Sequence, residues 1–190
     1  FVTTRGLGDI LNIGNQNRPK LFVRNIEKPT QLYARAIETD ARMDAAGNEL
    51  TQPDLVKVEH ALQEARAEGC ESVAICLLHG YRNPAHERQI GALAAELGFA
   101  NISMSHEVIS LMKLVGRAST TVADAYLTPV LRDYVNRVSK HLPDTDAAAT
   151  QLQFMMSSGG LTGASLFQGK DAVLSGPAGG VVGAVHVGRE

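Results

Sequence analysis

Two turns that contain serine and glycine, near the end of the chain, have the composition of anion-binding loops. They are Ser157–Gly160 and Ser175–Gly180. Because glycine lets backbone N–H groups turn toward a phosphate or carboxylate, and a helix start adds a favourable dipole, both turns could line a nucleotide or substrate pocket. A structural interpretation stays open for each: a simple turn for the first, and close packing of a helix on a sheet for the second. The candidate pocket-lining residues are Ser157, Ser158, Gly159, Gly160, Ser175, Gly176, Gly179 and Gly180.

The glycine spacing excludes two common nucleotide motifs. In the second turn it reads G-x-x-G-G-x-x-G, which is not a dinucleotide-binding fingerprint, and no G-K-[ST] follows to make a Walker A loop. Arg5, Arg82 and Arg117 are weaker candidates, because a guanidinium at a loop or helix start can bind a carboxylate or phosphate in bidentate fashion. Each of them could equally tie down a loop.

The spacing of the histidines and serines in the sequence does not identify a group of catalytic residues. His79, His86 and His106 have no H-x-x-x-H spacing and no evident acidic partner, so no metal site is predicted. His86 and Glu87 are expected to begin a helix, where Glu87 favours the dipole, although a catalytic His79 or His86 stays open. No G-x-S-x-G elbow is present. The catalytic residues are therefore left unassigned.

Composition narrows the class of protein. With 190 residues, 44% hydrophobic content and a formal net charge of −2, the chain can fill a core and offers no basic surface for nucleic acid. No apolar run approaches the length of a membrane span. Cys70 and Cys76 form no C-x-x-C motif, Cys76 is expected to be a buried thiol, and a reducing cytoplasm fits best.

Hydrophobic periodicity predicts an α/β fold in which helices cover a sheet. The hairpin expected within 32–51, with its turn at Gly47, would make that sheet mixed, and residues 1–30 are expected to form an irregular arm. The expected strands are 72–78, 99–108 and 152–156, and the expected helices are 51–69, 84–97 and 119–142, the last kinked or divided by Pro129.

Six sequence blocks, in order, resemble the hydantoinase A and 5-oxoprolinase family, which also includes the ATP-handling subunit of ketone carboxylases. The blocks span nearly the whole chain. They are TTRGLGDILNIGNQNRPKLF (3–22), LLHGYRNPAHE (77–87), SHEV (105–108), RASTTVADAYLTPVL (117–131), MMSSGGL (155–161) and LSGPAGGVVGA (174–184).

This resemblance implies an actin-like (ribonuclease H-like) ATPase architecture that uses ATP and Mg²⁺ to open five-membered cyclic amides of the hydantoin or 5-oxoproline type. It also implies a second subunit or fused domain of the hydantoinase B type. Family members are several times longer, and their D-x-G-G-T phosphate loop is absent here. We therefore expect an internal fragment that is inactive alone and binds no cofactor tightly. Its expected divisions are an arm from the preceding domain (1–30), an α/β core region (31–150) and the truncated start of the hydantoinase A catalytic domain (151–190).

Departures from the family pattern keep alternative functions open. Leu7-Gly8 replaces a usual Phe-Arg, Ser158 replaces a usual Asn, and LVGRAST replaces the more common EYERTST. These changes leave the substrate undefined. A ketone-carboxylase subunit and a non-hydrolytic ATP-binding or scaffold subunit are the two alternatives.

Overall fold

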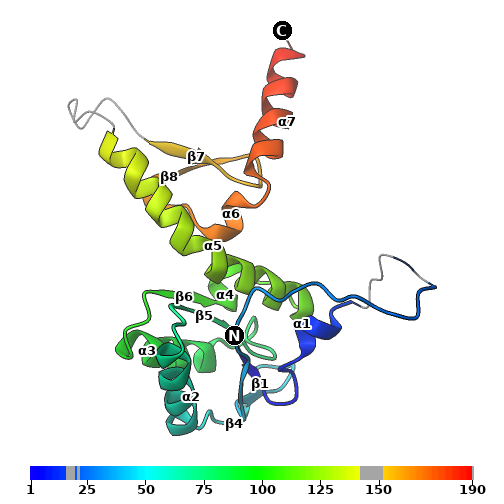
Figure 1. Ribbon diagram of the computed structural model, residues 1–190, viewed down its shortest axis with the longest axis vertical. Helices are drawn as coiled ribbons and strands as arrows, with labels where there is room; N and C mark the ends of the chain where they lie inside the picture. The colour runs from blue at the N-terminus through cyan, green and yellow to red at the C-terminus, as the bar shows by residue number, and fades with distance from the viewer. Residues whose placement is uncertain (16–19, 21, 142–151, 190) are drawn as a thin grey trace. The chain divides into compact units, whose positions relative to one another are not determined.

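The computed structural model describes residues 1–15, 20, 22–141 and 152–189 (Figure 1). Its contacts divide the chain into two units, Phe1–Ala125 and Tyr126–Glu190. The expected division at residues 150–151 lies outside the described residues.

A four-stranded parallel sheet organises the first unit. Its strands are β1 (Val2–Thr4), β2 (Ile37–Thr39), β5 (Ser72–Cys76) and β6 (Asn101–Met104), in the order β2-β1-β5-β6. The expectation of an irregular arm was wrong for Val2–Thr4, which is fully buried and lies between two other strands. A strand of three residues is too short for periodicity to reveal it.

The predicted hairpin is present but does not join this sheet. Strands β3 (Arg42–Met43) and β4 (Glu49–Thr51) pair antiparallel as a two-stranded sheet of their own. Gly47 has φ +92° in the turn between them, and the Asp44 carboxylate accepts the Asn48 N–H at 2.8 Å. The α/β class is therefore confirmed, with a parallel central sheet and the hairpin beside it.

Side chains alternate along β5 between two helical layers. Val73 and Ile75 pack in the core beneath α2 (Leu55–Ala67) and α3 (Ala85–Glu96). Ala74 and Cys76 pack on the other face, where α1 (Ile10–Ile13) and the first turns of α5 (Leu114–His141) contribute. This period-two pattern explains why the continuous apolar run forms a strand buried on both faces.

Helix boundaries differ from the prediction where a polar side chain caps the helix. Helix α2 was expected to begin near residue 51, but its first residue follows Asp54, whose carboxylate caps the helix by accepting the Lys57 N–H at 3.2 Å. The strand expected over 99–108 ends at Met104, and Ser105–Val108 forms the short helix α4.

Helix α5 starts earlier than predicted and contains Pro129 without being divided. Because proline has no N–H, the carbonyl of Ala125 loses its helical partner at this point. The two units meet in the chain at Ala125 and Tyr126.

The second unit contains the end of α5 and a small hairpin. Strands β7 (Gln153–Met155) and β8 (Leu161–Gly163) pair antiparallel, followed by the 3₁₀ turn η1 (Ala164–Leu166), α6 (Gly169–Ala172) and α7 (Ser175–Val187). Phe154 stacks on Phe167 with ring centroids 5.0 Å apart. The SGPAGG segment forms the first turns of α7, where Pro177 needs no helical N–H partner.

Candidate functional site

Polar side chains gather where β5 and β6 end. Leu77, Leu78 and His79 follow β5, and Ser105 and His106 follow its parallel neighbour β6. Ligands of open α/β sheets bind outside the carboxyl ends of the strands. This edge of the first unit is therefore the candidate site, which we call the β5–β6 edge (Leu77–Tyr81, Glu87, Ser105–Glu107 and Arg117).

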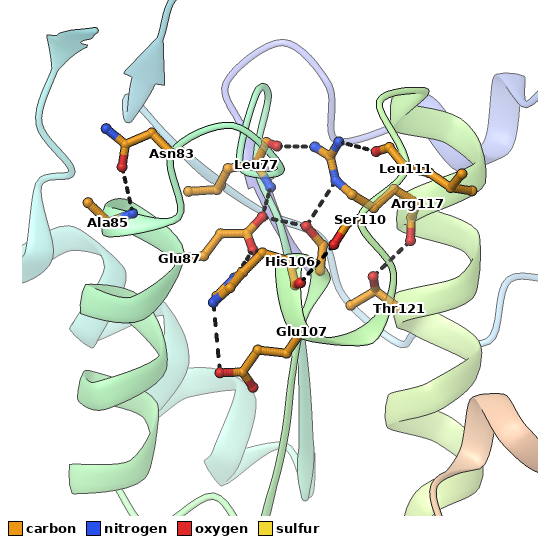
Figure 2. A network of polar contacts seen from close by, with 11 residues as sticks. Leu77, Asn83, Ala85, Glu87, His106, Glu107, Ser110, Leu111, Arg117 and Thr121 are labelled. Carbon is orange, nitrogen blue, oxygen red and sulfur yellow. Dashed lines mark hydrogen bonds and ion pairs between the residues drawn. The ribbon is translucent and has the colours of Figure 1, made fainter. Parts of the chain in front are cut away.

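The carboxylate of Glu87 is the centre of the β5–β6 edge. It comes from the first turn of α3 and is completely buried. One oxygen accepts the Leu77 N–H at 2.9 Å and the Ser105 hydroxyl at 2.6 Å. The other accepts the His106 N–H at 3.1 Å and lies 2.7 Å from the ring Nδ1 of His106 (Figure 2). These donors stabilise a charge that burial alone would destabilise.

Arg117 holds the same edge from α5 and is also completely buried. Its Nε donates to the Ser105 hydroxyl oxygen at 2.9 Å, and its terminal nitrogens donate to the carbonyls of Leu77 and Leu111 (Figure 2). Its guanidinium carbon lies 5.3 Å from the centroid of the Tyr81 ring. The Ser105 hydroxyl therefore accepts from the cation and donates to the Glu87 carboxylate.

These contacts select the tautomer of the His106 ring. Because a carboxylate only accepts, Nδ1 carries a hydrogen, and in the neutral form of the ring the lone pair is on Nε2. Nε2 is buried and has no hydrogen-bond partner among the described residues. The Glu107 carboxylate, 3.8 Å away, is too distant for a hydrogen bond.

His79 is a second unusual histidine at this edge. Its φ of 60° places it in the left-handed region, and within the described ranges it is the one non-glycine residue there. Its Nδ1 is buried and, among those residues, unpartnered, and its ring centroid lies 6.1 Å from that of Tyr81. Backbone strain of this kind concentrates at functional sites.

Cys76 lies beside these charges at the end of β5. It is a free thiol, completely buried, and burial raises its pKa to about 11, with Arg117 opposing that rise. The prediction of a buried thiol is confirmed. A thiol so far from ionisation is not a nucleophile at neutral pH.

The structure brings the two predicted turns close together in the second unit, but the second, Ser175–Gly180, forms the first residues of helix α7 rather than a loop. The Ser157 hydroxyl donates to the Asp171 carbonyl at 2.7 Å and accepts the Leu174 N–H at 2.9 Å, just before α7. A Cβ placed on Gly159, which has φ +85°, would lie 3.4 Å from Val182 of α7. The turn Ser157–Gly160 connects β7 to β8 and packs against the start of α7.

The other candidates in that region differ in how enclosed they are. The Ser175 hydroxyl donates to the Ala172 carbonyl at 3.0 Å, and a Cβ on Gly179 would contact Met155 at 3.5 Å. A Cβ on Gly176 or Gly180 would meet nothing within 4 Å. Ser158 is exposed and makes no hydrogen bond to the described residues.

The three candidate arginines have separate positions. Arg5 is exposed and pairs with Asp40 at 2.7 Å, after β1 and β2. Arg82 is exposed, and its Nε lies 3.5 Å from the Ala46 carbonyl in the hairpin turn. Arg117 alone belongs to the β5–β6 edge, as described above.

Sequence reasoning missed the acidic partners of two histidines. Glu87 bonds to His106, and the Glu49 carboxylate lies 2.8 Å from Nε2 of His86. Spacing could not show these pairs because their members are 19 and 37 residues apart. The available signal was the resemblance, since Glu87 and His106 both lie in the matching blocks LLHGYRNPAHE and SHEV.

The described residues contain no evident metal site and no membrane-spanning helix. No three His, Cys, Asp or Glu side chains there are grouped so that they could hold a metal ion. None of the helices described is long and apolar enough to span a membrane.

Comparison with known proteins defines the family. The model of the hydantoinase/oxoprolinase N-terminal region matches residues 1–98, and the hydantoinase/oxoprolinase model matches residues 117–190. The chain therefore belongs to the hydantoinase/oxoprolinase family, as the six blocks predicted. It is 40% identical over 210 residues to the 5-oxoprolinase of Saccharomyces cerevisiae, a match that covers 96% of this chain and 16% of that protein.

Two solved structures share the fold. The nucleotide-free structure of an acetone carboxylase matches with a TM-score of 0.85 and 21% identity, over 99% of this chain and 28% of that chain. The ATP-dependent caprolactamase of Pseudomonas jessenii matches with a TM-score of 0.74 and 24% identity, over 93% of this chain and 26% of the other. These likenesses confirm the predicted α/β fold. The chain spans about a sixth of the oxoprolinase that it matches.

Proposed function

We propose that the whole protein couples ATP hydrolysis to the opening of a five-membered cyclic amide, of the hydantoin or 5-oxoproline type. The observation that supports this most is the 40% identity to a 5-oxoprolinase across 96% of the chain. An unactivated cyclic amide is a poor electrophile, and phosphorylation of its oxygen would create a leaving group. Oriented donors and Mg²⁺ stabilise the charge on a transferring phosphoryl group.

The residues proposed to line the nucleotide or substrate pocket are in the second unit. Gly176 and Gly180 have room for a ligand to approach the backbone, and the Ser158 hydroxyl has no partner within the described part of the chain. Ser157 is already bonded to Asp171 and Leu174, so its role would be to hold the turn. No Mg²⁺ ligands are assigned, because the described residues offer no suitable group of side chains.

The proposal includes a second subunit or fused domain of the hydantoinase B type, which the family resemblance implies. It also includes a cytoplasmic location, supported by two free cysteines and by the need for ATP. The 190-residue chain alone is expected to be inactive, because it spans about a sixth of the oxoprolinase that it matches.

The test is a substrate screen on the full-length protein with its companion subunit. ADP release is measured with 5-oxoproline, hydantoin, and acetone plus bicarbonate, and the isolated 190-residue chain is assayed alongside. We expect ring opening with a cyclic amide and no turnover by the isolated chain. ADP release only with the ketone would identify a carboxylase subunit instead, and tight ATP binding without turnover would identify a scaffold. Turnover by the isolated chain would overturn the proposal that it is inactive alone.

A further inference from the structure

We propose that His106 is a proton acceptor in the ring-opening reaction, oriented by Glu87, and this rests on the proposed function. The arrangement is that of a carboxylate–histidine pair in which the carboxylate selects the tautomer and the far nitrogen acts as base. The 2.7 Å contact between Glu87 and Nδ1 places the lone pair on Nε2.

The rigidity of Glu87 distinguishes this pair from a surface ion pair. Its two oxygens accept from Leu77, Ser105 and His106, and Ser105 is itself held by Arg117. Glu87 and Arg117 are both completely buried. A base whose orientation is fixed by such support needs no reorganisation when it reacts.

The state of Nε2 is the observation that points to a ligand. A histidine that only tethered α4 to α3 would need Nδ1 and nothing more. Here the ring is nine-tenths buried, and its second nitrogen has no donor within the described residues. A buried acceptor left without a donor carries an uncompensated desolvation cost, which a water or substrate donor would remove.

The position of the ring agrees with this role. His106 leaves the carboxyl end of β6 beside the exit of β5, where ligands of parallel sheets bind. The strained His79 belongs to the same edge through Tyr81 and Arg117, and its Nδ1 is likewise buried without a partner among those residues. Two unpartnered ring nitrogens in one connected cluster favour a polar ligand over a purely structural role.

The proposed step conserves atoms and charge. Nε2 removes a proton from a water molecule as the water oxygen bonds to the ring carbon of the O-phosphorylated imidate, and this proton then passes from Nε2 to the ring nitrogen, so that His106 returns to the neutral form. When the ring C–N bond breaks, the remaining water proton also goes to the departing nitrogen, and the products are an amine and an acyl phosphate. A second water molecule hydrolyses the acyl phosphate to a carboxylate and inorganic phosphate. Ser105 is a positioning residue in this scheme, because its hydroxyl donates to Glu87 and accepts from Arg117.

The experiment distinguishes a catalytic base from a purely structural histidine. It replaces His106 with asparagine in the full-length protein, assayed with its companion subunit. The asparagine amide can keep the bond that Nδ1 makes to Glu87, but it has no equivalent of Nε2. Using whichever cyclic amide the wild type turns over, we expect kcat/KM to fall at least about 100-fold, with KM for ATP unchanged. The fall of kcat/KM at low pH, where a base becomes protonated, should also disappear. A His106→Ala variant should regain activity when imidazole is added.

The matched control is His86→Gln, which alters a second buried histidine paired with a glutamate and can keep the Nε2 contact to Glu49. It should leave kcat/KM within about threefold of wild type. If His106→Asn is as active as this control and keeps the wild-type pH profile, the proposal is wrong. If the wild type opens no cyclic amide, the proposed function is wrong. If the wild type opens a cyclic amide and His106→Asn does not slow it, only the role of His106 is wrong.

Discussion

The β5–β6 edge and the two serine-glycine turns represent opposite ways of building polar structure. At the β5–β6 edge, Glu87 and Arg117 are completely buried, and Ser105 connects them. In the second unit, Ser158 is exposed, and the positions of Gly176 and Gly180 are open. The first region orients side chains rigidly before any ligand arrives, whereas the second offers backbone that a ligand could approach.

The β5–β6 edge also has more buried apolar surroundings than the serine-glycine turns. The β5–β6 edge lies at the end of a sheet whose two faces are packed by buried side chains. Helix α7 has no buried residue, and Val181, Val185 and Val187 are exposed. Substitutions should therefore have large effects on stability at the β5–β6 edge and small ones at the serine-glycine turns.

The largest effect should come from Arg117→Ala. It removes the buried cation that is linked to the buried Glu87 carboxylate through Ser105, and it leaves the carbonyls of Leu77 and Leu111 without that donor. We expect a loss of about 3–5 kcal/mol in the local free energy of unfolding. Hydrogen exchange of peptides that cover residues 77–81 and 105–112 in the full-length protein would measure it.

Arg5→Ala is the control for that prediction. The Arg5–Asp40 pair has similar chemistry, but its side chains are 73% and 37% exposed. Its loss should cost no more than about 1 kcal/mol. Equal effects of the two substitutions would show that burial does not set the importance of Arg117.

The main elements of the fold could be predicted because their signals are local. The apolar run of β5 and the helical spacing of α2 and α3 each lie within one segment, and all three elements were expected. Strand β1 was missed because three residues have no period, and its burial depends on strands 35 and 73 residues away. The placement of the hairpin outside the sheet likewise depends on tertiary pairing.

The candidate site residues, like the fold, could be predicted only where the signal is local in the sequence. The two serine-glycine segments could be proposed because the residues of each are contiguous, and the structure places them close together, the second as the start of α7; their contact with a ligand stays a prediction. The network around Glu87 draws on residues 77, 87, 105 and 117, whose proximity is created by folding. Periodicity assigned Glu87 to a helix start, correctly, but could not show that its carboxylate faces inward.

An intermediate effect is expected from Gly80→Ala, with Gly183→Ala as its counterpart in α7. A Cβ on Gly80 would lie 2.3 Å from a Glu87 oxygen that is fixed by other bonds, so we expect a loss of about 1–3 kcal/mol. A Cβ on Gly183 would meet nothing within 4 Å in a helix interior, so alanine should stabilise α7 by about 0.5–1 kcal/mol. Thermal unfolding and hydrogen exchange would give both signs. A destabilising Gly183→Ala would show that this glycine face is covered in the whole protein.

The smallest effects should come from the neighbouring serines, and they test whether the turn binds a ligand. Ser157→Ala removes a hydroxyl that bonds to Asp171 and Leu174, so it should cost about 1 kcal/mol in stability. Ser158→Ala removes no bond to the described residues and should leave stability unchanged. If Ser158 lines the pocket, its loss should raise the KM for ATP or for the cyclic amide about fivefold, which corresponds to about one hydrogen bond.

These two substitutions distinguish a residue that holds the turn from a residue that contacts a ligand, because the first should change stability and the second should change KM. Ser157→Ala should lower stability and change KM only as far as the turn moves, whereas Ser158→Ala should change KM alone. If Ser158→Ala changes neither quantity, the turn is a structural connection between β7 and β8. The open backbone at Gly176 and Gly180 would then be the remaining candidate for ligand contact in the second unit.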